Sequence, residues 1–183
     1  QFNDVIFDPA CGTGGFLFDS FQYVIERVTK DGKWPGPKTH PELQEYFKNY
    51  FAQFNGKMPT TDTANAFYRN GVGGIEYLGM IRKMAAVNLF IRGLNPNNIE
   101  QGDSLKMFNP ASDAGSKSIV IANPPFGAER DQSAYPNVWE EYSKESETTI
   151  LFVKLMFDLV KKGGRCAVIV SEGFLTWDQN SAK

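Results

Sequence analysis

The chain has 183 residues, of which 42% are hydrophobic and 22% charged, and its formal net charge is −2. This composition excludes a disordered or fibrous protein and predicts one domain with a sizeable core. It also argues against a domain that holds a nucleic-acid duplex alone, because such a domain usually has a basic face and this chain has no long run of Lys and Arg.

The cysteines and the histidine do not form a recognisable site. Cys11, Cys166 and His40 have no spacing typical of a metal site or a disulfide framework, so a cytoplasmic, reducing location is expected. A catalytic triad would need His40, which lies among prolines and glycines. No stretch predicts a membrane span or a signal peptide. The chain begins almost directly on a strand and a motif, so we expect a piece of a longer protein.

Strands and helices are predicted to alternate from the first residues. A short apolar run at Val5–Asp8 indicates a strand, a turn with three glycines follows, and apolar residues at helical spacing then continue to about Lys30. Residues 31–73 are rich in turn formers, with a short helix possible at Pro41–Phe54. We interpret residues 31–73 as an insertion packed on the domain.

The rest of the chain continues the alternation. Strands are predicted at Gly74–Glu76, Asn98–Gly102, Ser118–Ala122 and Arg165–Ser171, helices at Leu78–Gly93 and Thr149–Lys162, and a mobile loop at Ala128–Ser146. The last two strands are continuous apolar runs and are expected to be buried. This pattern predicts an α/β fold in which a mostly parallel sheet has helices on both faces.

The glycine turn at Gly12–Gly15 is a candidate ligand site. Glycines between a first strand and a helix let the backbone approach a ligand where α/β sheets bind nucleotides. The spacing is neither GxGxxG nor a P-loop, so neither a dinucleotide nor a nucleoside triphosphate is favoured. A tight turn that only packs strand on helix is the alternative. With Asp8-Pro9 before the turn and Asn-Pro-Pro-Phe later, we favour a binding site.

Two acidic residues follow later predicted strands. Glu76 ends the second strand, where a carboxylate can accept hydrogen bonds from ribose hydroxyls, or can simply be an exposed strand end. Asp103 follows the third strand and can accept a hydrogen bond from an adenine amino group, or can cap a helix or turn. Both carboxylates are therefore candidate cofactor ligands.

The most specific motif is Asn123-Pro124-Pro125-Phe126, which follows a buried strand. The prolines restrict the backbone and donate no hydrogen bonds, so the Asn123 side-chain oxygen and the Pro124 carbonyl both present acceptors. An amino nitrogen that donates to both frees its lone pair to attack a methyl sulfonium. Phe126 offers a flat face on which a planar base or amide can stack. Asn-Pro alone would indicate a turn, but the whole motif favours transfer to nitrogen.

A covalent mechanism is not favoured. Cys11 lies inside the glycine turn with no His near it in the sequence, so it is expected to be a small side chain in a crowded turn. Methylation at a cytosine carbon uses a Cys that follows Pro, and neither cysteine of this chain does.

With these motifs the chain resembles N6-adenine DNA methyltransferases, in particular the modification subunit of type I restriction–modification systems. The resemblance rests on Asp8-Pro9-Ala10-Cys11-Gly12-Thr13-Gly14-Gly15-Phe16-Leu17, Gly74-Ile75-Glu76, Ala86–Gly93, Gly102–Leu105, Asn123–Gly127 and Lys162–Arg165. It covers most of the chain outside residues 31–73 and 128–146. The Asn-Pro-Pro-Phe motif alone is shared with RNA and protein-glutamine methyltransferases.

The resemblance implies a Rossmann-like fold that uses S-adenosylmethionine, truncated at both ends. It implies that the cofactor is held by the turn residues Asp8, Pro9, Ala10, Gly12, Thr13, Gly14, Gly15 and Phe16, with Glu76 at the ribose, Asp103 at the adenine and Asn123 beside the reacting groups. Asn123, Pro124, Pro125 and Phe126 would hold a flipped target adenine. Duplex DNA, a specificity subunit and a restriction subunit are the implied partners, with no metal and no membrane.

Overall fold

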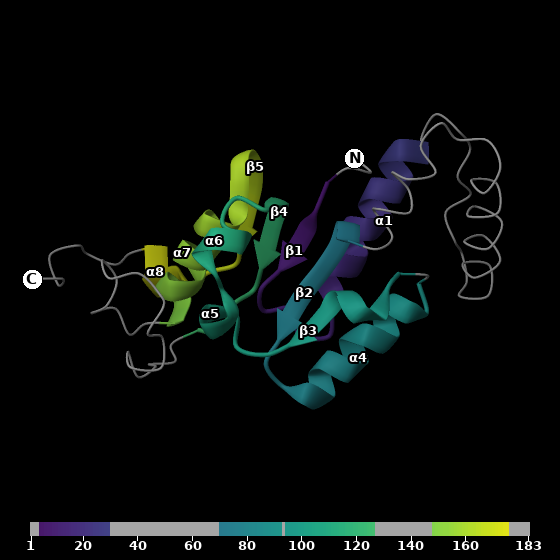
Figure 1. Cartoon of the computed structure of the whole chain (residues 1–183), viewed down its shortest axis with the longest axis horizontal. Helices are drawn as coiled ribbons and strands as arrows, with labels where there is room; N and C mark the ends of the chain where they lie inside the picture. Colours follow the sequence, from purple (N-terminus) through teal and green to yellow (C-terminus); the bar gives the residue numbers. More distant parts are fainter. Residues whose placement is uncertain (1–3, 30–69, 93, 127–147, 176–183) are drawn as a thin grey trace, which may run out of the picture.

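The computed structural model describes residues 4–29, 70–92, 94–126 and 148–175. Within them, five parallel strands form one sheet in the order β3-β2-β1-β4-β5 (Figure 1). The strands are β1 (Ile6–Asp8), β2 (Val72–Glu76), β3 (Ile99–Gln101), β4 (Lys117–Ala122) and β5 (Val160–Val168). The strand order reverses direction at β1, so the topological switch point lies between β1 and β4. The predicted parallel α/β sheet is confirmed.

Helices cover both faces of the sheet, as predicted (Figure 1). One face carries α1 (Gly15–Thr29) and α4 (Gly79–Phe90), and the other carries α5 (Ser104–Met107), α6 (Pro110–Asp113) and α7 (Thr148–Leu159). A 3-10 helix, η2 (Pro96–Asn98), precedes β3, and α8 (Glu172–Leu175) follows β5. None of the helices in the described residues is long and apolar enough to cross a membrane.

Each face has its own hydrophobic core. The core under α1 and α4 consists of Ile6, Cys11, Leu17, Phe21, Val72, Ala85, Leu89, Leu94 and Ile99. The core under α5 and α7 consists of Leu105, Phe108, Val120, Ala122, Leu151, Phe152, Leu155, Met156 and Leu159. Alternate residues of β4 are buried on the α7 side, which is the period-2 pattern of a strand. The two cores thus lie on opposite faces of the sheet.

The last predicted helix and strand differ from the structure. Helix α7 ends at Leu159 instead of Lys162, and β5 takes over at Val160 with a register shift opposite β4. Gly163 has φ +77°, a left-handed conformation that suits this irregular stretch. The strand was also expected to be buried, yet Val168 and Ile169 are 37% and 48% exposed. An apolar run indicates that a segment is hydrophobic, but the segment is buried only if other elements pack against it. Strand β5 lies at the edge of the described sheet and has a neighbouring strand on one side only.

Other boundaries shift by a few residues. Strand β2 begins at Val72, so Val72 and Gly73 do not belong to the predicted insertion. Helix α4 ends at Phe90 with Ile91 as its C-cap, before the expected Gly93. The remainder of the insertion, its possible short helix at 41–54, His40 and the predicted loop at 128–146 lie outside the described residues.

Candidate functional site

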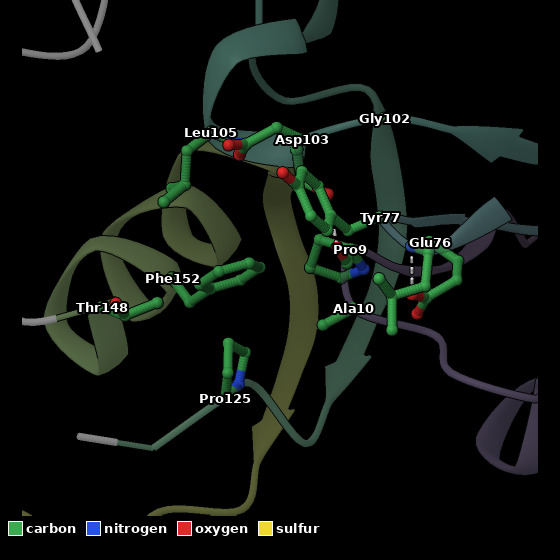
Figure 2. Close-up of a pocket in the computed structure, with 12 residues that line it drawn as sticks. Pro9, Ala10, Glu76, Tyr77, Gly102, Asp103, Leu105, Pro125, Thr148 and Phe152 are labelled. Atoms are coloured by element: carbon green, nitrogen blue, oxygen red, sulfur yellow. Dashed lines mark hydrogen bonds between the residues drawn. The ribbon is translucent and has the colours of Figure 1, made fainter. Parts of the chain in front are cut away.

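A cavity of about 270 Å³ opens at the carboxyl ends of the strands, next to the switch point. The loops after β1, β2, β3 and β4 and the beginning of α7 all contribute to its wall (Figure 2). The lining residues are Pro9, Ala10, Glu76, Tyr77, Leu78, Gly102, Asp103, Ser104, Leu105, Pro125, Thr148 and Phe152. The predicted site residues Pro9, Ala10, Glu76, Asp103 and Pro125 thus meet at one cavity, although they come from four different loops.

The glycine turn lies beside this cavity, between β1 and α1. The N–H of Gly14 donates to the carbonyl oxygen of Cys11 (2.8 Å), and Gly12 and Gly14 adopt φ values of +55° and +88°. Such values strain any residue with a Cβ, so the turn needs glycine at both positions. A Cβ at Gly12 or Gly15 would meet nothing within 4 Å. The space beside these two glycines is therefore open.

Glu76 connects the glycine turn to the cavity. Its Oε2 accepts a hydrogen bond from the N–H of Gly12 (3.0 Å), and its Oε1 accepts one from the N–H of Leu78 (2.7 Å). Each carboxylate oxygen has a second acceptor direction, so the side chain can still accept hydrogen bonds from a ligand. Glu76 is half-buried and held by two backbone groups, so it is not a loose residue at an exposed strand end.

Asp103 caps helix α5. Its carboxylate accepts a hydrogen bond from the N–H of Leu105 (3.2 Å), which is the capping alternative that the sequence left open. The same residue lines the cavity. Ser104 donates its hydroxyl proton to the carbonyl oxygen of Pro9, which ties the loop after β3 to the loop after β1. The cap and this hydrogen bond together fix one wall of the cavity.

The predicted site residue Asp8 and the neighbouring Cys11 are both buried beneath the turn. Asp8 is 2% exposed and accepts a hydrogen bond from the N–H of Ala10 (2.9 Å). Burial raises the pKa of its carboxyl to about 7, and the nearby charge of Glu76 adds to this rise. Burial likewise raises the pKa of the Cys11 thiol to about 12, so this thiol stays protonated at neutral pH and is a poor nucleophile. The expectation of a structural Cys11 agrees with these surroundings.

The Asn123–Phe126 segment follows β4 at the same edge of the sheet. Asn123 and Pro125 are exposed, Pro124 is buried, and Phe126 is 46% exposed. Pro125 also forms part of the cavity wall. The amide of Asn123 and the ring of Phe126 do not line the cavity, but they are exposed on either side of Pro125, which does.

Sequence reasoning missed much of the cavity wall. The additional lining residues are Tyr77, Leu78, Gly102, Ser104, Leu105, Thr148 and Phe152. Tyr77 and Leu78 directly follow the predicted carboxylate and could have been inferred from that position. Phe152, in contrast, lies on α7 and faces the cavity across from Glu76 (Figure 2). Only the packing of α7 brings it there, because its spacing in the sequence is that of an ordinary core residue.

The described residues contain no group of three or more His, Cys, Asp or Glu that could hold a metal ion. The polar chemistry of the site in the described residues is thus that of carboxylates, an amide and backbone groups.

This arrangement of strands and loops agrees with what the sequence shares with known proteins. The family model of the N-6 DNA methylases matches residues 1–183. The chain belongs to this family. The N-6 DNA methylase match covers the glycine turn, the cavity and the Asn123–Phe126 segment alike.

Curated relatives of this N-6 DNA methylase chain include subunits of restriction enzymes. The chain is 25% identical over 177 residues to the type I restriction enzyme EcoEI methylase subunit of Escherichia coli, covering 96% of the chain and 29% of that subunit. It is 24% identical over 180 residues to the EcoKI methylase subunit of Escherichia coli strain K12, covering 96% and 28%. The chain thus spans less than a third of the length of these relatives.

Solved structures share the fold. The type I restriction enzyme EcoKI M protein superposes with a TM-score of 0.65 at 21% identity, covering 94% of this chain and 31% of that one. A modification subunit of a putative type I restriction enzyme from Vibrio vulnificus YJ016 gives 0.64 at 24% identity, covering 100% and 33%. A putative class I S-adenosylmethionine-dependent methyltransferase from Listeria monocytogenes gives 0.60 at 18%, covering 100% and 43%. These similarities confirm the predicted methyltransferase type of α/β fold.

Proposed function

We propose that this chain is the catalytic core of an adenine-specific DNA methyltransferase, which transfers a methyl group from S-adenosylmethionine to the exocyclic N6 amino group of adenine. The observation that carries this proposal is that one cavity is lined by Glu76 at the end of β2, Asp103 after β3 and Pro125 of the Asn-Pro-Pro-Phe motif after β4. A cofactor pocket and an amino-group binding motif are thereby neighbours. Membership of the N-6 DNA methylase family supports DNA adenine as the substrate.

The residues present are suited to S-adenosylmethionine. Open space beside Gly12 and Gly15 leaves room for a ligand against the turn backbone. Glu76 keeps acceptor directions for ribose hydroxyls, and Asp103 lies on the cavity wall as an acceptor for an adenine amino group. The apolar Leu105, Pro125 and Phe152 complete a wall on which an adenine ring can pack. When bound, this cofactor supplies a methyl group on a positively charged sulfur.

The target amino group is assigned to the Asn123–Phe126 segment. The side-chain oxygen of Asn123 and the carbonyl oxygen of Pro124 would accept the two N–H bonds of adenine N6 and so orient its lone pair. The half-exposed ring of Phe126 provides a face for stacking an extruded base. Cys11, buried and protonated, takes no part, so the transfer needs no covalent intermediate on the protein.

The relatives support a proposal about the partners. Both relatives described above are methylase subunits of type I restriction enzymes and are about three times as long as this chain. We therefore assign the chain to the modification subunit of such a system, with a specificity subunit and a restriction subunit as partners. The net charge of −2 supports partners that supply much of the DNA contact. The part of residues 31–73 that precedes β2 is assigned to an insertion in this core.

The decisive experiment measures methylated bases in DNA from cells that express the intact gene with its neighbouring genes. The DNA is digested to nucleosides, and N6-methyladenine is quantified against an Asn123→Ala variant expressed at the same level. Methyladenine that depends on Asn123 is the expected result.

Two results would contradict the proposal. An equal amount of methyladenine with the Asn123→Ala variant would show that Asn123 does not have the assigned role. Absence of methyladenine, with the protein expressed and S-adenosylmethionine bound, would indicate that the substrate is RNA or a protein glutamine. Detection of methylated RNA bases or of methylglutamine would then distinguish these two substrates.

A further inference from the structure

The side chain of Asn88 connects helix α4 to the glycine turn by a hydrogen bond. The Nδ2 of Asn88 donates a hydrogen bond to the carbonyl oxygen of Thr13 (3.1 Å). The N–H of the same peptide group, which belongs to Gly14, donates to the carbonyl oxygen of Cys11 (2.8 Å). The peptide group between Thr13 and Gly14 is therefore held at both of its polar atoms, once within the turn and once from α4.

A second peptide group of the turn is held in the same way by Glu76. The carbonyl oxygen of Cys11 accepts the bond from Gly14, while the N–H of Gly12 donates to Glu76. Because Gly12 and Gly14 carry no Cβ, the backbone alone permits several turn conformations of similar energy. Hydrogen bonds from outside the turn select one of them, and in the described residues these bonds come from β2 and α4.

The helix end that carries Asn88 is packed against α1 through Arg92. Arg92 donates from Nη1 to the carbonyl oxygen of Asn88 (3.0 Å), and its guanidinium group lies 4.2 Å from the centroid of the Phe18 ring. The Phe18 ring in turn fills the space beside Gly14, 2.8 Å from where a Cβ would lie. The carboxyl end of α4 is thus packed on the beginning of α1, so the Asn88 side chain is presented in a defined place.

We propose that Asn88 is a positioning residue, which holds the glycine turn in the conformation that accepts S-adenosylmethionine. This inference rests on the proposed function, because it concerns the cofactor of that site. Asn88 acts through the Thr13–Gly14 peptide group and does not itself contact the cofactor. Its loss weakens cofactor binding and leaves the transfer step unchanged once the cofactor is bound.

The test compares two asparagines that make the same kind of bond at opposite ends of the sheet. Asn98 donates from Nδ2 to the carbonyl oxygen of Val72 (2.8 Å), at the beginning of β2 and away from the cavity. Asn88→Ala, Asn88→Asp and the control Asn98→Ala are made in the intact protein. The measurements are the Kd of S-adenosylmethionine by calorimetry, the melting temperature without cofactor, and KM and kcat.

We expect Asn88→Ala to raise the Kd and KM for S-adenosylmethionine roughly tenfold, as for one lost hydrogen bond, with kcat unchanged. Asn88→Asp should weaken binding further, because a carboxylate oxygen then repels the carbonyl oxygen of Thr13. Asn98→Ala should lower the melting temperature to a similar degree as Asn88→Ala and leave the Kd unchanged.

Three results would overturn the inference. Unchanged Kd in both Asn88 variants would show that the turn does not need this bond. An equal rise in Kd for Asn98→Ala would reduce the effect to general destabilisation. If the unaltered protein binds neither S-adenosylmethionine nor S-adenosylhomocysteine, the proposed function itself fails, and the inference about Asn88 fails with it.

Discussion

The glycine turn after β1 and the Asn123–Phe126 segment after β4 lie at the same edge of the sheet but are built in opposite ways. The backbone of the turn is hydrogen-bonded to Cys11, Glu76 and Asn88, and the buried residues Asp8 and Cys11 lie beneath it. The second segment instead exposes Asn123 and Phe126. The proposed role of the turn thus depends on its backbone conformation, whereas the proposed role of the Asn123–Phe126 segment depends on accessible side chains.

This difference has a consequence for mutagenesis. Changes that break the hydrogen bonds of the turn or displace its backbone should affect stability and cofactor binding together, because the same hydrogen bonds serve both. Changes at Asn123 and Phe126 should affect methyl transfer alone, because exposed side chains contribute little to folding. The experiments below separate these two kinds of effect.

The largest effect is expected at Asn123. Asn123→Ala should lower kcat by roughly 10²–10³-fold, the range found when one hydrogen-bonding group at a transition state is removed. The melting temperature and the Kd of S-adenosylmethionine should stay unchanged, and the exposed Asn97→Ala serves as the matched control. If the melting temperature fell together with kcat, Asn123 would instead be a structural residue, and the two regions would not differ in the way described.

The next effect concerns the strand beneath the turn. A Cβ on Gly74 would lie 2.5 Å from the carbonyl oxygen of Asp8 and 2.9 Å from the Cβ of Cys11. Gly74→Ala should therefore destabilise the protein by about 1–3 kcal/mol in chemical denaturation and displace the turn. The control is Gly15→Ala, whose Cβ meets open space, so it should preserve stability yet weaken S-adenosylmethionine binding. Equal free energies of unfolding for Gly74→Ala and Gly15→Ala would contradict this prediction and would show that the turn can shift to accommodate the added Cβ.

A pH dependence distinguishes the buried region from the exposed one. The pKa of Asp8 is about 7 in the folded chain against an ordinary value of 3.8, which applies after unfolding. Between these values the folded chain binds more protons than the unfolded chain, so the free energy of unfolding should fall as pH rises from about 4 to about 7. The slope should approach about 1.4 kcal/mol per pH unit.

Replacing Asp8 isolates this contribution. Asp8→Asn keeps an oxygen acceptor for the N–H of Ala10 and cannot ionise, so urea unfolding from pH 4.5 to pH 8 should show a smaller decline than in the unaltered protein. The exposed Asp19→Asn is the control and should retain the full decline. An unchanged slope in Asp8→Asn would assign the pH dependence to other groups.

The smallest effect is expected at Phe126. Phe126→Ala should reduce kcat/KM for DNA roughly tenfold, since stacking of a base on an aromatic ring contributes about 1–3 kcal/mol. Phe126→Tyr should retain most of the activity, because the stacking face is preserved. Phe157→Ala, at a 64% exposed position on α7, should change nothing. Loss of cofactor affinity in Phe126→Ala would show that the two regions are not independent.

Much of the fold was predictable because local signals agreed with one another. The apolar runs before Pro9 and Asn123, the glycines of the turn and the helical spacing after Gly79 each indicated an element that the structure contains. The least accurate prediction was the stretch after Leu159, where the helix ends earlier and the strand is exposed. Its hydrophobicity could not indicate whether the strand lies at the centre or at the edge of the sheet.

By itself the sequence determined the alternation of strands and helices and the two motifs, because turn chemistry and hydrophobic periodicity act over a few residues. Tertiary structure alone decided that Glu76 and Asn88 bind the turn backbone, and that Phe152 of α7 faces the same cavity as Pro125. Glu76 lies 64 positions from Gly12 in the sequence, and Asn88 lies 75 positions from Thr13. Spacing in the sequence carries no record of such contacts, since they arise from the order of strands in the sheet and from how helices pack on its faces.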